Sequence, residues 1–204
     1  THRQSSAASD VYKRQGDLCI WDLANPAQPS LYPALKGNSQ STGQGVDITH
    51  LAWNRKVQHI LASTSSGGTT VVWDLKRQRQ VISFTDPNLK RRCSALQWNP
   101  EVATQLVVAS DDDRSPTLQV WDLRNSISPL REFVGHTKGV LSLSWCDVDS
   151  SLLHSSGKDN RTICWDAEAG EPLCELPSSG NWNFDVQWCP CLLYTSDAAD
   201  DCRC

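Results

Sequence analysis

The chain has 204 residues, a formal net charge of −4 and a hydrophobic content of 39%. These values are typical of a globular protein of one or two domains. No apolar run approaches the roughly 18 residues that a transmembrane helix requires, and the first residues do not resemble a secretory signal. The chain has nine Trp and no Met, and the positions of the tryptophans show how the chain is organised.

Both ends of the chain are predicted to be non-native. Residues 5–15 read SSAASDVYKRQ and residues 191–201 read CLLYTSDAADD. A single DNA segment encodes the first peptide on one strand and the second on the complementary strand, in a shifted frame. That segment looks like a sequencing adaptor. We therefore expect residues 1–15 and 191–204 to be adaptor-like tails, and residues 16–190 to be the native part.

The cysteines near the C-terminus resemble a zinc site, with Cys189 and Cys191 followed by Cys202 and Cys204. Three of these four thiols lie in the predicted tail, so we reject a metal site. The other cysteines are not spaced like a disulfide framework. They are expected to be small buried apolar residues of a protein from a reducing compartment, and they are Cys19, Cys93, Cys146, Cys164, Cys174 and Cys189.

Two series of tryptophans alternate along the chain. One series is followed by Asp, at Trp21, Trp73, Trp121 and Trp165, and the other ends apolar stretches, at Trp53, Trp98, Trp145 and Trp188. The distance from a member of the second series to the next Trp-Asp pair is nearly constant. The spacing resembles that of WD repeats, in which each repeat forms one four-stranded blade of a β-propeller.

The predicted elements in chain order start with a third strand over 16–23 and a fourth strand near 30–35. The polar segment 36–45 is predicted to be a loop between blades. Three complete blades follow, over residues 46–86, 93–134 and 140–176, and residues 181–189 are predicted to be the first strand of another blade. The fold class is therefore all-β, a WD-repeat β-propeller fragment with three complete four-stranded blades and two partial blades. We expect it to be internal to a longer propeller, because such propellers have roughly 4–8 blades.

The stretch 135–166 matches the repeat most fully, since it begins with Gly-His and ends with Trp-Asp. In WD repeats, a His, a Ser or Thr, an Asp and the Trp form a hydrogen-bonded set. The resemblance assigns this structural tetrad to His136, Ser155, Asp159 and Trp165. A catalytic His-Asp-Ser group is the less favoured interpretation of the same residues.

The other two blades depart from the repeat pattern. Gly43-Gln44 and Gly67 stand where blade one would have Gly-His and Asp, and Leu89 replaces the His of blade two. The turn of blade two is lengthened to DDDRSP, residues 111–116. We expect packing, and not a polar set, to fix the turns of these blades.

No residue pattern indicates catalysis or binding to nucleic acid. The sequence contains no nucleophile elbow, phosphate-binding loop or zinc-protease motif, and His50, His59 and His154 are isolated. The two basic clusters, 76–79 and 90–92, are predicted to lie on opposite faces of the propeller. The second is expected to share its face with Asp111, Asp112 and Asp113, which weakens the field available for phosphate binding.

Longer stretches resemble one family in particular, and they are ITHLAWNRKVQHILASTS, CSALQWNPEVATQLVVASDDDRSPTLQVWDLR and LLHSSGKDNRTICWDAEAGEPLCELPSSGNWNFDVQWCP. They are similar to the propeller of the SEC31 family, the large outer-cage subunit of the COPII vesicle coat. The resemblance spans nearly all of 16–190. It includes the lengthened turn 111–116, which generic WD repeats do not share.

The resemblance implies a non-enzymatic structural scaffold in transport from the endoplasmic reticulum to the Golgi. Its expected partners are the smaller propeller subunit of the outer cage and further copies of itself, with no cofactor, no metal and no nucleic acid. The expected location is the cytosolic face of the endoplasmic reticulum, peripheral to the membrane. Two alternatives are a generic WD-repeat adaptor that binds peptide motifs, such as a ubiquitin-ligase substrate receptor or chromatin reader, and a propeller hydrolase.

Overall fold

The computed structural model describes residues 18, 20–22, 25, 28, 30–31, 47–86, 91–178 and 180–188. The predicted tails, residues 1–15 and 191–204, lie outside these described residues. So do the predicted loop 36–45, with Gly43-Gln44, and Leu89.

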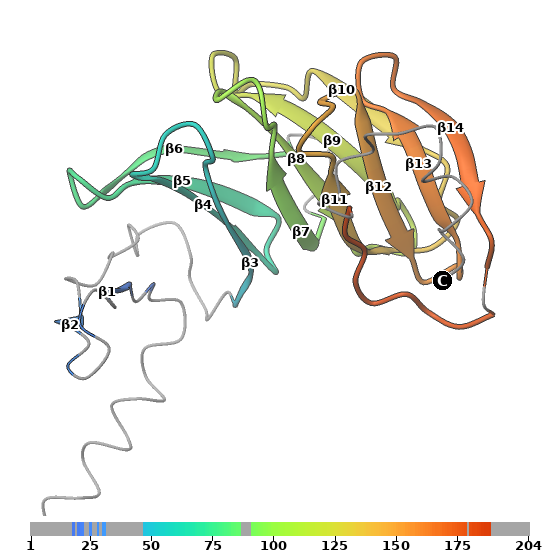
Figure 1. Ribbon diagram of the computed structural model, residues 1–204, viewed down its shortest axis with the longest axis horizontal. Helices are drawn as coiled ribbons and strands as arrows, with labels where there is room; N and C mark the ends of the chain where they lie inside the picture. Colours follow the sequence, from blue (N-terminus) through green and yellow to red (C-terminus); the bar gives the residue numbers. More distant parts are fainter. Residues whose placement is uncertain are drawn as a thin grey trace, which may run out of the picture.

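Three antiparallel sheets of four strands each form the body of the structure (Figure 1). The first sheet contains β3 (Ile48–Trp53), β4 (Ile60–Ser65), β5 (Thr69–Asp74) and β6 (Arg79–Thr85). The second contains β7 (Cys93–Trp98), β8 (Gln105–Ser110), β9 (Thr117–Asp122) and β10 (Arg131–Val134). The third contains β11 (Val140–Trp145), β12 (Leu152–Gly157), β13 (Thr162–Asp166) and β14 (Glu171–Leu176).

Within each sheet the strands pair in chain order, so each sheet is one blade, and we call them blades one, two and three. The predicted fold class and the three complete blades are confirmed. Of the described residues, none belongs to a helix that is long and apolar enough to cross a membrane.

A partial blade precedes blade one. The short strands β1 (Trp21–Asp22) and β2 (Ser30–Leu31) pair with Trp21 opposite Leu31. They lie within the predicted third and fourth strands, 16–23 and 30–35. The buried Leu18 joins Leu61 and Trp73 of blade one in a small apolar cluster. This early segment therefore packs against blade one as a neighbouring blade would.

The predicted first strand over 181–189 differs in the structure. Residues 182–188 belong to no strand ladder, because a strand needs a hydrogen-bonded neighbour and no described strand pairs with this segment. Its position is nevertheless that of a first strand. The Trp188 Nε1 group donates to the Ser144 carbonyl at 2.9 Å, just as Trp98 Nε1 of blade two donates to the Ala52 carbonyl at 3.0 Å.

Apolar side chains fill the spaces between adjacent blades. Strand residues alternate between the two faces of a sheet, and both faces of blade two are covered. One core cluster joins blades one and two, and another joins blades two and three. At both contacts a third-strand Trp meets a fourth-strand Phe of the preceding blade, with ring centroids 4.5 Å apart for Trp121 and Phe84 and 5.7 Å apart for Trp165 and Phe133.

The first strands β3, β7 and β11 lie side by side in the structure (Figure 1). Polar contacts tie them together in addition to the apolar core. The Gln97 side-chain oxygen accepts a hydrogen bond from the Trp145 backbone N–H at 2.7 Å, and the Ser94 hydroxyl donates to the Val140 carbonyl at 2.6 Å. The relative position of the blades is thus set along their inner edge.

An Asp or Asn residue that follows a blade Trp closes the next turn in several places. The carboxylates of Asp74 and Asp166 accept backbone N–H bonds from residues two and three positions later, which closes the turn into the fourth strand. The amide oxygens of Asn54 and Asn99 close the turn after the first strand in the same way. Short side-chain acceptors favour such turns because they satisfy otherwise unpaired backbone donors.

The Phe133→Ala substitution tests the packing between blades two and three. Phe133 is fully buried against Trp165, so its removal should lower the free energy of unfolding by about 3–5 kcal/mol through lost burial and a cavity. Chemical denaturation monitored by Trp fluorescence measures this. The neighbouring Val134, which is 70% exposed, provides the control Val134→Ala, expected to change stability by about 0.5 kcal/mol or less. Equal effects of the two substitutions would contradict this account of the interface.

Candidate functional site

The structure brings together all four residues of the predicted tetrad in blade three. The Trp165 indole Nε1 donates to Ser155 Oγ at 2.7 Å, and Ser155 Oγ lies 2.7 Å from His136 Nε2. The other ring nitrogen, His136 Nδ1, lies 3.1 Å from both carboxylate oxygens of Asp159. The four side chains form one continuous chain of hydrogen bonds.

The partners of His136 define its protonation state. The Asp159 carboxylate is an acceptor, so His136 Nδ1 donates to it, and His136 Nε2 then accepts the Ser155 hydroxyl proton. This arrangement needs a neutral imidazole. Burial lowers the pKa of His136, and this effect outweighs the Asp159 charge, which acts in the opposite direction. With its side chain fully buried, His136 is therefore neutral at pH 7.

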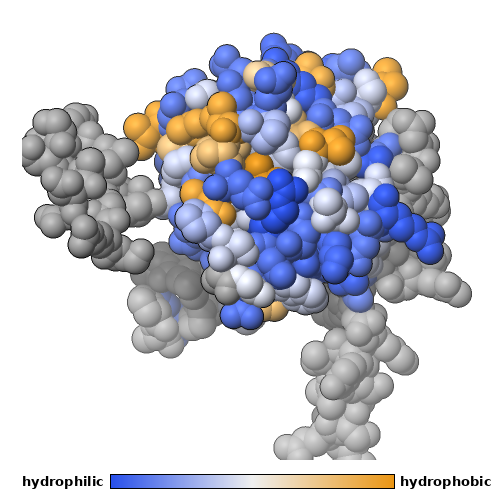
Figure 2. Space-filling model, turned by 90° about the vertical axis from the view of Figure 1, so that its right-hand side faces the viewer, coloured by the Kyte–Doolittle hydropathy of each residue, from blue (hydrophilic) through white to orange (hydrophobic). Residues whose placement is uncertain are grey.

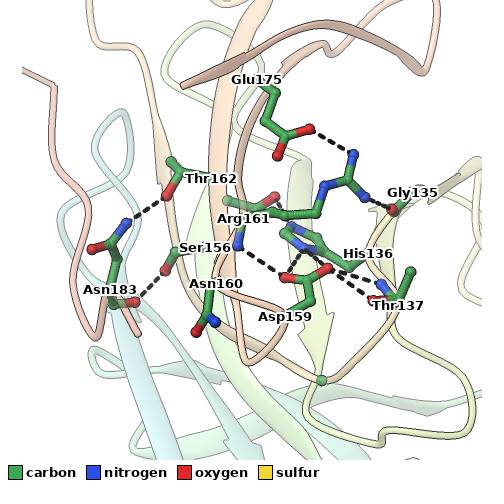
Figure 3. A network of polar contacts seen from close by, with 12 residues as sticks. Gly135, His136, Thr137, Ser156, Asp159, Asn160, Arg161, Thr162, Glu175 and Asn183 are labelled. Carbon is green, nitrogen blue, oxygen red and sulfur yellow. Dashed lines mark hydrogen bonds and ion pairs between the residues drawn. The ribbon is translucent and has the colours of Figure 1, made fainter. Parts of the chain in front are cut away.

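Asp159 connects the buried chain to the turn between β12 and β13 (Figure 3). Burial by itself would raise the pKa of Asp159, but the Thr137 backbone N–H and His136 hold the pKa below its usual range. The carboxylate accepts from the Thr137 N–H at 2.9 Å and from the Arg161 N–H at 3.2 Å. Its hydrogen bonds therefore fix two segments, the one before β11 and the one before β13.

Two glycines allow the tetrad to pack this closely. A Cβ atom on Gly157 would lie 2.6 Å from both His136 Nδ1 and Asp159 Oδ1, and one on Gly135 would lie 2.7 Å from the Trp165 ring. Larger residues at these positions would displace the tetrad side chains. The Gly-His pair at the start of the repeat is thus a packing requirement as well as a hydrogen-bonding one.

Arg161 forms further hydrogen bonds beside the tetrad, which the sequence analysis did not predict. Its guanidinium donates to the Gly135 carbonyl at 2.7 Å and to the Glu175 carboxylate at 2.9 Å (Figure 3). It therefore ties the outer strand β14 to the segment that carries His136. The sequence signal for this role was a charged residue two positions after the tetrad Asp. Charged residues are common in turns, so the signal is not specific.

Blades one and two hold their turns by means other than packing alone, so that expectation is wrong. In blade one the Trp73 indole donates to Ser63 Oγ at 2.9 Å, and the Ser65 hydroxyl closes the turn by donating to the Thr69 carbonyl at 3.0 Å. In blade two the Ser110 hydroxyl accepts the Asp112 N–H at 3.2 Å. Local hydroxyl groups replace part of the polar set in each case.

A charged cluster joins blades one and two in the region where blade three has its tetrad. The largely buried guanidinium of Arg91 lies 2.8 Å from the Glu132 carboxylate and 3.7 Å from that of Asp86, and it contacts Thr117 Oγ1. The Gln119 side-chain amide donates to Asp86 at 2.8 Å. The sequence placed Arg91 in a basic surface cluster, but these partners largely neutralise its charge.

The lengthened turn of blade two, 111–116, contacts blade three. The Asp113 carboxylate accepts the Gly139 N–H at 2.9 Å, and Lys158 forms ion pairs with Asp111 and Asp113. A Cβ atom on Gly139 would lie 2.3 Å from the Asp111 carbonyl oxygen, so this contact requires glycine. The extra residues therefore act as a bridge between two blades.

The same turn neutralises part of the second basic cluster, as the sequence predicts. Arg92 lies 3.5 Å from the Asp111 carboxylate. In the first cluster, Arg77 lies 3.6 Å from the Asp74 carboxylate. Both clusters thus include a side chain paired with an acid.

The structure does not bring the other histidines together with the tetrad. His154 lies in β12 and stacks on Trp188, with centroids 3.8 Å apart, and burial lowers its pKa. His50 lies in β3, and burial lowers its pKa as well, against the opposing charge of Asp185. Within the described part of the chain, no group of three or more His, Cys, Asp or Glu side chains is arranged to hold a metal ion.

The substitution His136→Ala should lower the free energy of unfolding by about 1–3 kcal/mol, because it leaves Ser155 and Asp159 buried without a shared partner. Denaturant titration of the purified chain measures the change. His59→Ala is the matched control, since His59 lies outside the tetrad and is only partly buried. A denaturation midpoint unaltered by His136→Ala would refute a stabilising tetrad.

Acid should destabilise the chain through the same histidine. The pKa of His136 in the folded state is below the 6.5 of the unfolded chain, so the unfolded state binds more protons as the pH falls. The stabilising contribution is complete above about pH 6.5 and is lost as the pH falls below that value. His50 and His154 act in the same direction. Unfolding free energies from about pH 7.5 to about pH 5 should therefore fall less steeply in the His136→Ala variant. Parallel curves would contradict this assignment.

No protein-family model matches the chain. A relative from Arabidopsis thaliana, "Protein transport protein SEC31 homolog B", is 58% identical over 175 residues, which is 86% of this chain and 16% of the relative. "Protein transport protein Sec31A" from Danio rerio is 48% identical over 176 residues, covering 86% of this chain and 14% of that protein. The chain thus spans a small part of the length of these relatives.

Solved structures with the same fold include a COPII coat. A chain of "COPII on membranes, outer coat vertex" superimposes with a TM-score of 0.71 at 36% identity, over 83% of this chain and 45% of that one. A chain of "Crystal Structure of Mitotic Checkpoint Complex" gives a TM-score of 0.70 at 22% identity, over 85% of this chain and 48% of that one, a likeness of fold alone. The resemblance predicted from the irregular blades is confirmed by these matches. The chain belongs to the SEC31 family and carries a WD-repeat β-propeller segment of it.

Proposed function

We propose that this segment is a non-enzymatic structural scaffold of the COPII coat in transport from the endoplasmic reticulum to the Golgi. The observation that carries the proposal is the match to a chain of a COPII outer coat vertex, at 36% identity over 83% of this chain. The expected partners are the smaller propeller subunit of the outer cage and further copies of the same protein. The expected location is the cytosolic face of the endoplasmic reticulum.

The distribution of polar side chains supports a scaffold role. The tetrad, the Arg91 cluster and the bridge at Asp113 each join neighbouring strands or neighbouring blades. Rigid blades with fixed relative positions suit a protein that transmits geometry through a cage. We propose that His136, Ser155, Asp159 and Trp165 are structural and do not catalyse a reaction.

The side of blade three that carries β14 presents apolar surface for further contacts. On the side of the molecule where β14 lies, apolar side chains occur in groups separated by polar ones (Figure 2). The exposed apolar residues of β14 and the following segment are Leu173, Leu176, Trp182 and Phe184. Leu176 is the counterpart in β14 of Phe84 and Phe133, which receive the Trp of the next blade. Part of this surface therefore has the form of a blade interface.

We also propose that residues 1–15 and 191–204 are not part of the native protein. The Arabidopsis relative aligns over 175 residues, a length that matches the span 16–190. The sequence similarity to a DNA adaptor on both strands supports the same interpretation.

A generic WD-repeat adaptor that binds peptide motifs is the second candidate. The fold alone is compatible with it, since the checkpoint-complex chain shares the architecture at 22% identity. The higher identity to a coat chain favours the scaffold.

A segment exchange tests the scaffold proposal. Residues 16–190 replace the corresponding segment of the Danio rerio relative, and the purified chimera is added to the remaining coat components on membranes. The expected result is a coat with regular vertices in electron micrographs, because the exchanged segment should supply the same contacts. A control chimera receives an equally long segment from an unrelated WD-repeat propeller and should form none.

Failure of both chimeras, with both proteins folded by circular dichroism, would reject the scaffold proposal for this segment. Vertices formed equally well by both chimeras would reject it too, because any propeller would then suffice. Binding of the unmodified segment to peptide motifs, with no coat assembly, would favour the adaptor.

A further inference from the structure

Two cysteines face each other across the outer strands of blade three. Cys164 lies in β13 and Cys174 in β14, and they are direct partners in the antiparallel register. The Cα atoms of such partners are roughly 4.5–5.5 Å apart. This range lies within the 4.4–6.8 Å found for disulfides. The register alone therefore places the two thiols where they can be bonded without moving the backbone far.

The two thiols also interact in the reduced state. Burial raises the pKa of Cys164 to about 11, and the Cys174 side chain adds to this effect through its charge and a hydrogen bond. Cys164 is 6% exposed, whereas Cys174 is exposed on the outermost strand. The pair thus combines one thiol that a reagent reaches from solvent with one that is protected from direct attack.

The corresponding pairs in the other two described blades contain no cysteine. They are Val72 with Ile82 in blade one and Val120 with Arg131 in blade two. Arg131 is exposed although blade three packs beside it. In blade one the same position is covered, since Ile82 is partly buried and packs against the core between blades one and two. Access of Cys174 to solvent is therefore a property of the described chain, in which no described strand pairs beyond β14.

We propose that Cys164 and Cys174 form a redox-sensitive dithiol site, reduced at rest, that closes to a cross-strand disulfide on exposure to a small disulfide oxidant such as oxidised glutathione. The proposal is independent of the coat function.

The reaction balances as two thiol–disulfide exchanges. The Cys174 thiolate attacks one sulfur of oxidised glutathione, which breaks the S–S bond, releases one glutathione thiolate and leaves a mixed disulfide on Cys174. The Cys164 thiol then loses its proton to solvent and attacks Cys174 Sγ, which expels the second glutathione thiolate. Two protein thiols are oxidised, and one glutathione disulfide is reduced to two glutathione molecules.

The disulfide would stabilise an edge of the fold. All residues of β14 are exposed, and an exposed edge strand frays easily and pairs with other chains. The neighbouring Glu175 holds Arg161, which in turn holds the segment before His136. Fixing β14 to β13 at Cys164 should therefore also restrain these hydrogen bonds beside the tetrad.

Peptide mapping after oxidation tests the proposal on the full 204-residue chain. The folded chain is incubated with oxidised glutathione, its remaining thiols are alkylated, and it is digested without reduction. We expect a peptide pair linked between Cys164 and Cys174, lost again on treatment with reduced glutathione. The oxidised chain should also resist proteolysis in β14 more than the reduced chain.

Two variants serve as controls. Cys174→Ser changes an exposed residue, so the fold should persist, and it should abolish the linked pair and leave Cys164 reduced. Cys93→Ser removes a buried thiol whose register partner is Ser110, and it should leave the linkage intact. The proposal fails if Cys164 remains reduced in the folded wild type. It also fails if Cys164 bonds to another cysteine, or if linkage appears only after denaturation.

Discussion

The contact of Trp165 with its surroundings is the interaction on which blade three depends. Its ring stacks on Phe133 of blade two, and its indole N–H donates to Ser155 at the start of the hydrogen-bonded chain that ends at Asp159. One side chain thus couples the burial of apolar surface between blades to the geometry of a turn within a blade. A single blade cannot bury both of its faces, so each sheet requires neighbours. The Trp of the third strand is buried in blades one, two and three, and it packs on Phe in two of them.

The blades solve the polar part of this problem in different ways. Blade three uses a neutral His between Ser and Asp, whereas blade one keeps only a Trp-to-Ser bond and blade two substitutes a charged cluster at the blade interface. Buried polar groups destabilise a fold unless they are paired, and each of these arrangements provides partners. Segments that depart from the repeat pattern also connect neighbouring blades. The turn 111–116 does so through the hydrogen bond between Asp113 and Gly139. This irregular geometry fits a scaffold, in which the relative placement of rigid units is the working property.

The exposed outer strand of blade three imposes a second constraint on this segment. The outer strand β14 is exposed throughout, and Glu171 and Glu175 lie among its apolar residues. Charges and proline on an edge strand discourage pairing with foreign strands, and Pro172 adds to this protection. The Cys164–Cys174 pair lies at the same edge, in a register that neither of the other described blades uses for cysteine. The edge strand that the proposed disulfide would stabilise therefore also carries the thiol that solvent reaches, Cys174.

The sequence by itself determined the three complete blades, their strands and the tetrad, because alternating apolar residues and Trp-Asp turns act locally and recur at a nearly fixed period, and the single Gly-His pair, Gly135-His136, marks the blade with the full polar set. It also identified the family, since the departures from that period are specific. Only the tertiary structure showed that Arg91 lies among Asp86 and Glu132, that Asp113 reaches Gly139, and that Cys164 faces Cys174. It also showed that 182–188 belong to no paired strand. These features depend on strand register and on contacts between blades. Residues far apart in the sequence determine both, so no local sequence pattern predicts them.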